Sequence, residues 1–318
     1  MGENSAPPST VESDLPGLFR EADRAALVSQ KRYYTVSRIS LIAAVVAAIG
    51  SAASIDVTDS LDLGGAVSGV AFLVGGALTL YLFWQRPDRV WYENRAVAES
   101  IKTLVWQFCM RGGSFDRSTA DDERLFAREI ADMVRAMRYA GLVVTGKNEE
   151  VTANMRAVRR LPLADRQAIY REQRTDDQNR YYARKAEENR VRARRWFLAA
   201  IAFHAAGVVL AWLKAVNVVD ADLLGIAATA AASALAWVQT RDSQNLAEMY
   251  RVAANELAVI GELEQPGDPQ AWSAHVGNGE RAISREHTLW LARREPSLTP
   301  ADPTQKSNKP GAGPGSSV

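Results

Sequence analysis

The chain is poor in the residues that usually build chemical sites. Its 318 residues include a single cysteine, Cys109, and three histidines. One cysteine excludes an internal disulfide framework and a cysteine-rich zinc or iron–sulfur site. Charge of one sign is lacking too, because 38 Lys and Arg face 37 Asp and Glu and leave a net charge of +1. We therefore expect no nucleic-acid partner and no trap for acidic substrates.

Sequence motifs for catalysis are also missing. There is no Gly-rich phosphate loop between a strand and a helix, no Gly-x-Ser-x-Gly elbow, no His-Glu-x-x-His pair and no EF-hand loop. Glu280, Glu286 and His287 come nearest to a metal site, but a solvated, charge-rich surface helix explains them better. Without a convergent set of acid, base, nucleophile or metal ligands, we expect no enzyme, no cofactor and no metal.

Charge is missing locally as well, in four long windows. The uncharged windows cover residues 39–55 (17 residues), 63–85 (23), 196–213 (18) and 223–240 (18). A helix rises about 1.5 Å per residue, so each window approaches the length needed to cross a hydrocarbon core about 30 Å thick. We predict an all-α membrane protein with four transmembrane helices in two tandem two-span hairpins. The alternative is a large soluble bundle that buries these helices.

The charges that flank the windows are sorted by sign. Basic residues such as Arg38, Arg86, Arg195 and Arg241 border the long polar segments. The hairpin tips are acidic and carry Asp56, Asp59, Asp62, Asp220 and Asp222, with one Lys214. A soluble bundle has no reason to sort charge in this way, whereas the positive-inside rule explains it. We predict a multi-pass membrane protein with both termini and the central segment in the cytoplasm.

The two hairpins share residues at equivalent positions of the sequence. An offset of 156 residues places Arg95 on Arg251 and Ala98 on Ala254, both just after the second span of each pair. Equivalent residues at equivalent places indicate an internal duplication.

A helix with one apolar seam follows each hairpin. The seam residues are Val90, Asn94, Val97, Ile101 and Leu104 after the first hairpin, and Leu246, Tyr250, Ala253 and Leu257 after the second. Alternating steps of four and three are typical of a helix that packs on another helix, and a polar Asn94 can specify register or oligomeric state. The seam belongs either to a coiled-coil stalk between copies of the chain or to the chain's own core.

The remaining segments complete the expected organisation. We expect a disordered N-terminus (1–17), a first hairpin with its stalk (18–111), a helical connector (112–160), a second hairpin with its stalks (161–264), a C-terminal helical segment (265–294) and a disordered tail (295–318). Pro162 suits the first turn of a helix that runs unbroken into the third span.

Two groups of residues are candidates for a pore or gate. His204 lies inside the third window, and an ionisable group at membrane depth is by default a functional candidate. The purely structural alternative is a neutral imidazole that is hydrogen-bonded to a neighbouring carbonyl. The acidic tips Asp56, Asp59, Asp62, Asp220 and Asp222 would attract cations to a pore mouth, or they serve only as topology determinants.

Short motifs around both hairpins resemble a known family. They are Gln178 to Ala186 with Asn189 and Trp196, Glu280-x-Ala282-Ile283-x-x-Glu286-His287-x-x-Trp290, Arg32-Tyr33-Tyr34, and Arg95 to Lys102. These motifs are similar to those of the SLATT superfamily, the SMODS- and SLOG-associating two-transmembrane effector domains of bacteria. The resemblance runs from about Leu18 to Arg294 and indicates two tandem copies.

The resemblance implies an effector of the bacterial inner membrane, and it supplies no catalytic residue. For this family it implies an oligomeric pore that kills or arrests an infected cell when a nucleotide-signalling or ligand-sensing protein triggers it. We therefore expect a lipid bilayer, further copies of the chain and a signalling protein as partners. The alternative is a membrane-anchored scaffold or sensor that acts through its cytoplasmic helices, with the hairpins as anchors only.

Overall fold

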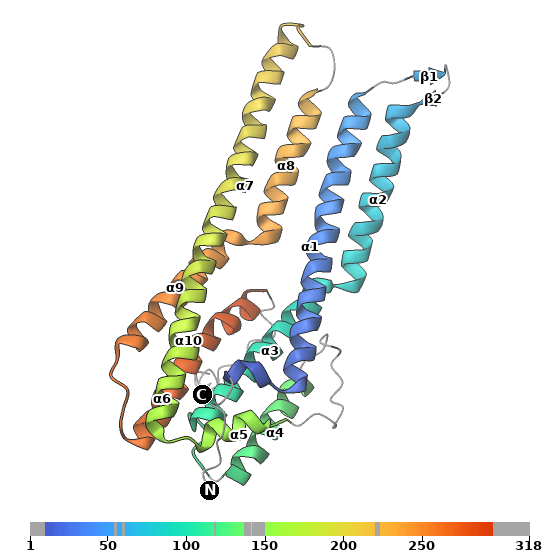
Figure 1. The fold of residues 1–318 in the computed structure, drawn as a ribbon. Helices are drawn as coiled ribbons and strands as arrows, with labels where there is room; N and C mark the ends of the chain where they lie inside the picture. Colours follow the sequence, from blue (N-terminus) through green and yellow to red (C-terminus); the bar gives the residue numbers. More distant parts are fainter. Residues whose placement is uncertain are drawn as a thin grey trace, which may run out of the picture.

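A computed structural model describes residues 10–53, 56–58, 61–117, 119–136, 141, 150–219 and 223–294. The described chain is almost entirely helical, and four of its helices are long and apolar enough to cross a membrane (Figure 1). The predicted all-α membrane architecture is therefore confirmed. The tail predicted to be disordered, 295–318, lies outside the described residues.

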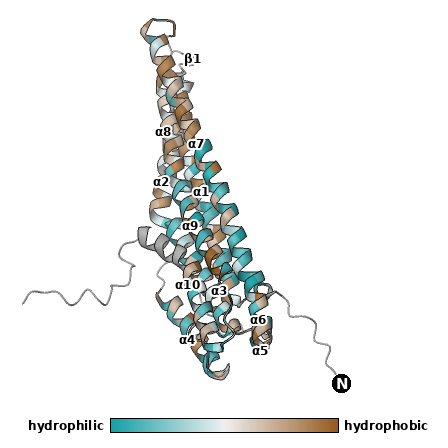
Figure 2. Cartoon of the chain, turned by 90° about the vertical axis from the view of Figure 1, so that its left-hand side faces the viewer, coloured by the Kyte–Doolittle hydropathy of each residue, from teal (hydrophilic) through white to brown (hydrophobic). Residues whose placement is uncertain are grey.

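The spans form two helical hairpins. The first pairs α1 (Gly17–Ala52) with α2 (Leu63–Gln85), and the second pairs α7 (Asp177–Ala215) with α8 (Leu223–Arg241). In the first tip, β1 (Asp56–Thr58) and β2 (Leu61–Asp62) form a short antiparallel ladder that the sequence did not indicate. Hydropathy divides the molecule into an apolar span layer and a polar helical body (Figure 2).

Small residues let the first hairpin close tightly. A Cβ atom on Gly64 would lie 1.8 Å from the carbonyl oxygen of Ala53, so only glycine allows this approach of α2 to α1. Ser68 fills the same contact and donates a hydrogen bond of 2.8 Å to the carbonyl of Ala47. Close contact of this kind replaces the hydrophobic driving force that is absent between helices in lipid.

The four spans pack in a row rather than around a centre. Helix α2 packs on α1, α1 packs on α8, and α8 packs on α7 (Figure 1). Large apolar side chains remain exposed along this row, among them Leu73 (75%), Phe72 (68%) and Trp212 (70%). Such a surface is stable only against lipid or against further protein.

Both hairpins pass into the next helix through the same backbone conformation. Arg86 lies between α2 and α3 (Pro87–Met110) with φ 41°, and Asp242 lies between α8 and α9 (Ser243–Glu262) with φ 48°. Both residues adopt the left-handed conformation that is uncommon outside glycine, and they are related by the offset of 156 residues. This shared turn supports the internal duplication.

A continuous helical rod leads into the third span. It consists of α6 (Leu163–Tyr170), a π-helical segment η2 (Arg171–Asp176) and α7. The rod agrees with the expected unbroken helix after Pro162. The π-helical segment was not expected, and it carries the buried Arg174.

The polar body has its own core. Helices α4 (Thr119–Ala136), α5 (Ala153–Arg160) and α10 (Pro269–Arg294) surround α3 and its large buried side chains, which include Trp106 and Phe108. The 3₁₀ turn η1 (Val11–Asp14) inserts Val11 into this core, and Leu15 follows. The expected disorder of residues 1–17 is therefore wrong for this part of the N-terminus, because these two apolar side chains are buried.

The predicted seams lie inside the chain. Asn94, Val97 and Ile101 are fully buried in α3, and Leu104 packs against the same core. In α9, Ala253 and Leu257 are buried with Tyr182, and Tyr250 packs against them, whereas Leu246 is half-buried. Val90 is also half-buried. Of the two interpretations left open, the structure favours the chain's own core over a stalk between copies.

Two fully buried ion pairs hold the body together. Arg159 of α5 pairs with Asp122 of α4. Arg174 donates to Glu280 of α10 through Nε (2.9 Å) and Nη2 (2.6 Å), and the Tyr170 hydroxyl donates to the same carboxylate at 3.2 Å. Burial lowers the pKa of Arg174, but Glu280 outweighs it and raises the pKa above its ordinary value. Glu280 is therefore no solvated surface residue, in contrast to the sequence-based interpretation.

We predict that Glu280→Gln destabilises the body strongly. The change keeps the shape but leaves the buried Arg174 charge with only its longer ion pair to Glu12, at 3.8 Å. Loss of one partner of a buried pair costs about 3–5 kcal/mol. The melting temperature of the purified protein in detergent measures this loss. Glu248→Gln is the matched control, since the Glu248 side chain is 70% exposed in its pair with Arg251. Equal melting temperatures for the two variants would contradict the prediction.

Candidate functional site: a cavity between the two repeats

The structure separates the residues predicted to form a pore or gate. His204 lies on an exposed part of α7. Its Nδ1 atom is 2.8 Å from the carbonyl oxygen of Ala200, as expected for the purely structural alternative. Asp62 caps α2 by accepting from the N–H groups of Gly64 and Gly65. Asp56 lies in β1. The other tip acids, Asp59, Asp220 and Asp222, lie outside the described residues.

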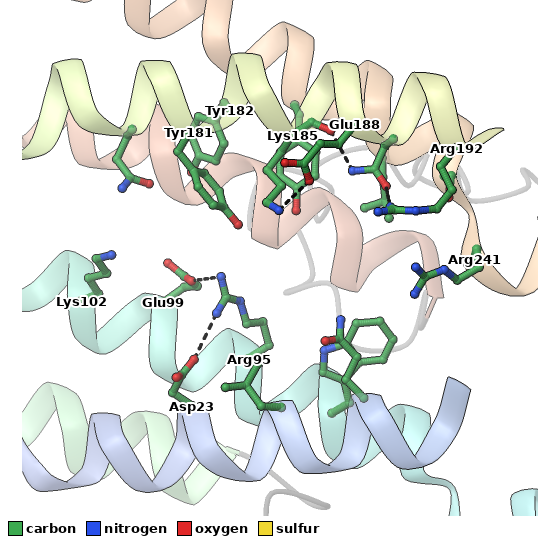
Figure 3. Close-up of a pocket in the computed structure, with 18 of the residues that line it drawn as sticks. Asp23, Arg95, Glu99, Lys102, Tyr181, Tyr182, Lys185, Glu188, Arg192 and Arg241 are labelled. Atoms are coloured by element: carbon green, nitrogen blue, oxygen red, sulfur yellow. Dashed lines mark hydrogen bonds and ion pairs between the residues drawn. The ribbon is translucent and has the colours of Figure 1, made fainter. Parts of the chain in front are cut away.

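A cavity of about 710 Å³ lies in the helical body instead. One wall comes from α1 and α3 of the first repeat, and the other comes from α7 and α9 of the second (Figure 3). Its charged lining consists of Arg95, Lys102, Lys185, Arg192 and Arg241 and of Glu12, Asp23, Glu99, Asp177 and Glu188. The cavity therefore lies at the interface between the two repeats.

Arg95 anchors the wall from the first repeat. Its Nη1 atom donates to Asp23 of α1 at 3.2 Å, and Nη2 pairs with Glu99 one turn further along α3. Burial lowers the pKa of Arg95, yet Glu99, the hydroxyls of Tyr181 and Tyr250 and finally Asp23 outweigh it and raise this pKa. Tyr181 and Tyr250 belong to the opposite wall. Arg95 thus couples the two repeats electrostatically.

Tyrosines and a lysine form the wall from the second repeat. The rings of Tyr182 and Tyr250 stack with centroids 5.8 Å apart, and Tyr181 meets Tyr250 edge-on at 6.3 Å. Lys185 donates to Glu188 at 2.8 Å. Three of these residues, Tyr181, Tyr182 and Lys185, belong to the motif that precedes the third span. Sequence analysis found the motif but not the cavity that it lines.

An aromatic cluster joins the repeats at the end of the cavity next to the spans. The Arg241 guanidinium lies 4.4 Å from the ring centroid of Tyr34 in α1 and 5.7 Å from that of Trp237 in α8. Tyr34 also meets Trp91 edge-on at 5.2 Å and Trp237 at 6.1 Å. This cluster connects α1 and α3 to α8, where the two hairpins pack on each other.

Paired charges and aromatic rings line the cavity. Among the described residues, no three His, Cys, Asp or Glu side chains are grouped so that they would hold a metal ion. The thiol of Cys109 is buried elsewhere in the body, and burial raises its pKa to about 12 although Arg159 opposes the shift. Paired charges and aromatic rings suit the recognition of a ligand.

The fold defines a multi-pass helical membrane protein built from two tandem two-span units with a shared polar body. Family comparison agrees with this division. The model for SMODS and SLOG-associating 2TM effector domain 3 matches residues 16–167, and the model for SMODS and SLOG-associating 2TM effector domain 1 matches residues 170–290. The chain therefore belongs to the SLATT family and carries two tandem SLATT domains. No curated protein and no solved structure matches it.

We predict that Arg95→Gln loosens the wall of the first repeat. The substitution removes charge-assisted hydrogen bonds between α1 and α3 and lowers the free energy of unfolding by about 1–3 kcal/mol. Thermal unfolding in detergent measures the change. Arg251→Gln is a matched control, because Arg251 is the equivalent residue of the second repeat and its side chain is 64% exposed. If Arg251→Gln lowers the free energy of unfolding as much as Arg95→Gln does, the role assigned to Arg95 in holding α1 and α3 together is overturned.

Proposed function

We propose that this chain is a bacterial membrane effector that assembles into oligomers and opens a pore during a conflict or antiphage response. SLATT domains are two-transmembrane effector domains, and two of them occur here in tandem. The observation that carries the pore proposal is the open row of spans α2, α1, α8 and α7. A row of four helices encloses no aqueous lumen by itself, so a pore requires several copies.

The surface of the row supports assembly. The most apolar window of the rod that contains α7 is only 6% buried within the chain. Exposed Val208, Val209 and Trp212 on α7 and exposed Phe72 and Leu73 on α2 lie on the two outermost spans of the row. Packing of one row against the next would cover these side chains and leave a central space.

His204 gives the assembled spans a polar group. It is the one histidine in four windows that contain no Lys, Arg, Asp or Glu. Its exposed position on α7 is compatible with a place along a lumen. The acidic tips would then lie at the mouth and favour cations.

We propose an orientation with the helical body in the cytoplasm of the bacterial cell. The basic residues at the span ends, such as Arg195 and Arg241, lie on the side of the body, whereas Asp62 lies at a tip. This sorting follows the positive-inside rule and leaves both termini in the cytoplasm. There the body is accessible to a trigger, which we expect to be a nucleotide-signalling or ligand-sensing protein.

Expression of the chain in bacterial cells should dissipate the membrane potential and stop growth. A voltage-sensitive dye reports the potential, and an unrelated four-span protein expressed at the same level controls for the load on the membrane. The assay is run with and without any signalling protein that the neighbouring genes encode. Full membrane integration with unchanged potential in both settings would exclude the pore and favour a membrane-anchored scaffold or sensor.

Lateral assembly through the exposed spans predicts a disulfide between copies. Leu73→Cys places a thiol on the exposed face of α2, whereas the native Cys109 is buried. Mild oxidation of membranes should then yield a cross-linked dimer on a non-reducing gel. Ala71→Cys is the control, because Ala71 is 8% exposed within its own hairpin and its thiol stays inside. Cysteines are also introduced along the exposed faces of α2 and α7. If all of these variants give only monomer on the gel, the proposed oligomer is contradicted.

A further inference from the structure

Two arginines at one end of the inter-repeat cavity stand apart from its other cations. Arg95 pairs with Asp23 and Glu99, Lys102 pairs with Glu12, and Lys185 pairs with Glu188. In the part of the chain that the structure describes, by contrast, no carboxylate lies within ion-pair distance of Arg192 or Arg241. Positive charge is therefore left uncompensated at this end of the cavity.

Neighbouring side chains hold both guanidinium groups in place. Arg192 Nη1 donates to Asn189 Oδ1 at 2.9 Å, and Arg241 lies over the ring of Tyr34. The pKa of Glu188, one turn before Arg192 on α7, is lowered first by Lys185, then by Arg184 and least by Arg192. Both arginines line the cavity and lie at the same end of it (Figure 3).

The position of the pair relates it to the membrane surface. Arg192 comes four residues before the third uncharged window, and Arg241 ends α8. Both side chains are half-buried, so part of their hydration is lost without a compensating negative charge. A bound anion would supply the missing negative charge.

We propose that Arg192 and Arg241 bind a phosphate group in the inter-repeat cavity. Guanidinium groups suit this anion because their planar N–H donors match phosphate oxygens in pairs. The phosphate has two possible sources: the headgroup of an anionic phospholipid in the adjoining leaflet, and a soluble phosphorylated molecule that enters the cavity. Both present the same chemistry to the two arginines.

The site belongs to the second repeat but touches the first. At the offset of 156 residues, Arg192 and Arg241 correspond to Val36 and Gln85, so the first repeat supplies no equivalent pair. Arg241 nevertheless packs on Tyr34 of α1. A phosphate bound here stabilises one arrangement of the two hairpins, which makes the site a means of control if the hairpins form a pore. That consequence rests on the proposed function, whereas binding itself does not.

Binding is tested on the purified full-length protein. One arm uses nanodiscs of phosphatidylcholine with and without phosphatidylglycerol and measures the lipid retained after extraction. The other arm uses phosphatidylcholine nanodiscs alone and titrates inorganic phosphate and then ATP, with tryptophan fluorescence as the readout. We expect retention or saturable binding in at least one arm, and the arm that responds identifies the source of the phosphate.

Variants then locate the site. R192Q with R241Q should weaken the binding at least about tenfold, since both charge-assisted contacts to the phosphate are lost. R194Q with R251Q removes the same charge from exposed positions outside the cavity and should leave binding unchanged. R192K with R241K keeps the charge, and an intermediate loss of binding supports paired recognition even if the glutamine variant folds poorly.

Two results overturn the proposal. One is the absence of retention or saturable binding by the wild-type protein in both arms. The other is an equal loss of binding in the R194Q and R251Q control, which indicates unspecific attraction by basic residues. Neither result depends on ion conductance, so a failure of the pore proposal remains distinguishable from a failure of this one.

Discussion

Lipid solvates neither ions nor unpaired backbone groups, and this constraint organises the whole molecule. Each span must be a helix, and the four windows contain none of the 75 charged residues of the chain. The charge that the structure describes is therefore concentrated in the polar body and at the tips. The body has to bury some of it, as it does with Arg159 and Arg174. The exclusion of charge from lipid thus explains both the apolar row of spans and the charge-rich body.

The two tandem SLATT domains form similar hairpins that pack in unlike positions. Helix α8 lies between α7 and α1, whereas α2 lies at the edge of the row. The same asymmetry continues into the body. Arg95 lines the cavity, while its equivalent Arg251 is exposed beside Glu248. A cavity on the joint between repeats follows from this unequal packing, and it offers a ligand contacts with both copies at once.

The buried ion pairs explain how distant segments are fixed in the body. Glu280 of α10 meets Arg174, which lies 106 residues earlier in the π-helical part of the rod. Asp122 and Arg159 join α4 to α5 in the same way. Such pairs tolerate few alternative arrangements, because an unpaired charge in the core is costly. The Arg174–Glu280 pair connects the long rod that enters the membrane to the C-terminal helix.

Composition and spacing alone determined the four spans, the two hairpins and the repeat, since the absence of charge over membrane-length windows and the offset of 156 residues are local properties of the chain. The heptad-like seams were also visible, but periodicity does not reveal whether the partner helix belongs to the same chain. Tertiary structure decided that point by burying Val97 and Ile101 within the body. It also decided the order of the spans, the burial of Glu280 and the placement of Arg192 and Arg241 at one end of the cavity, because these depend on contacts between helices far apart in sequence.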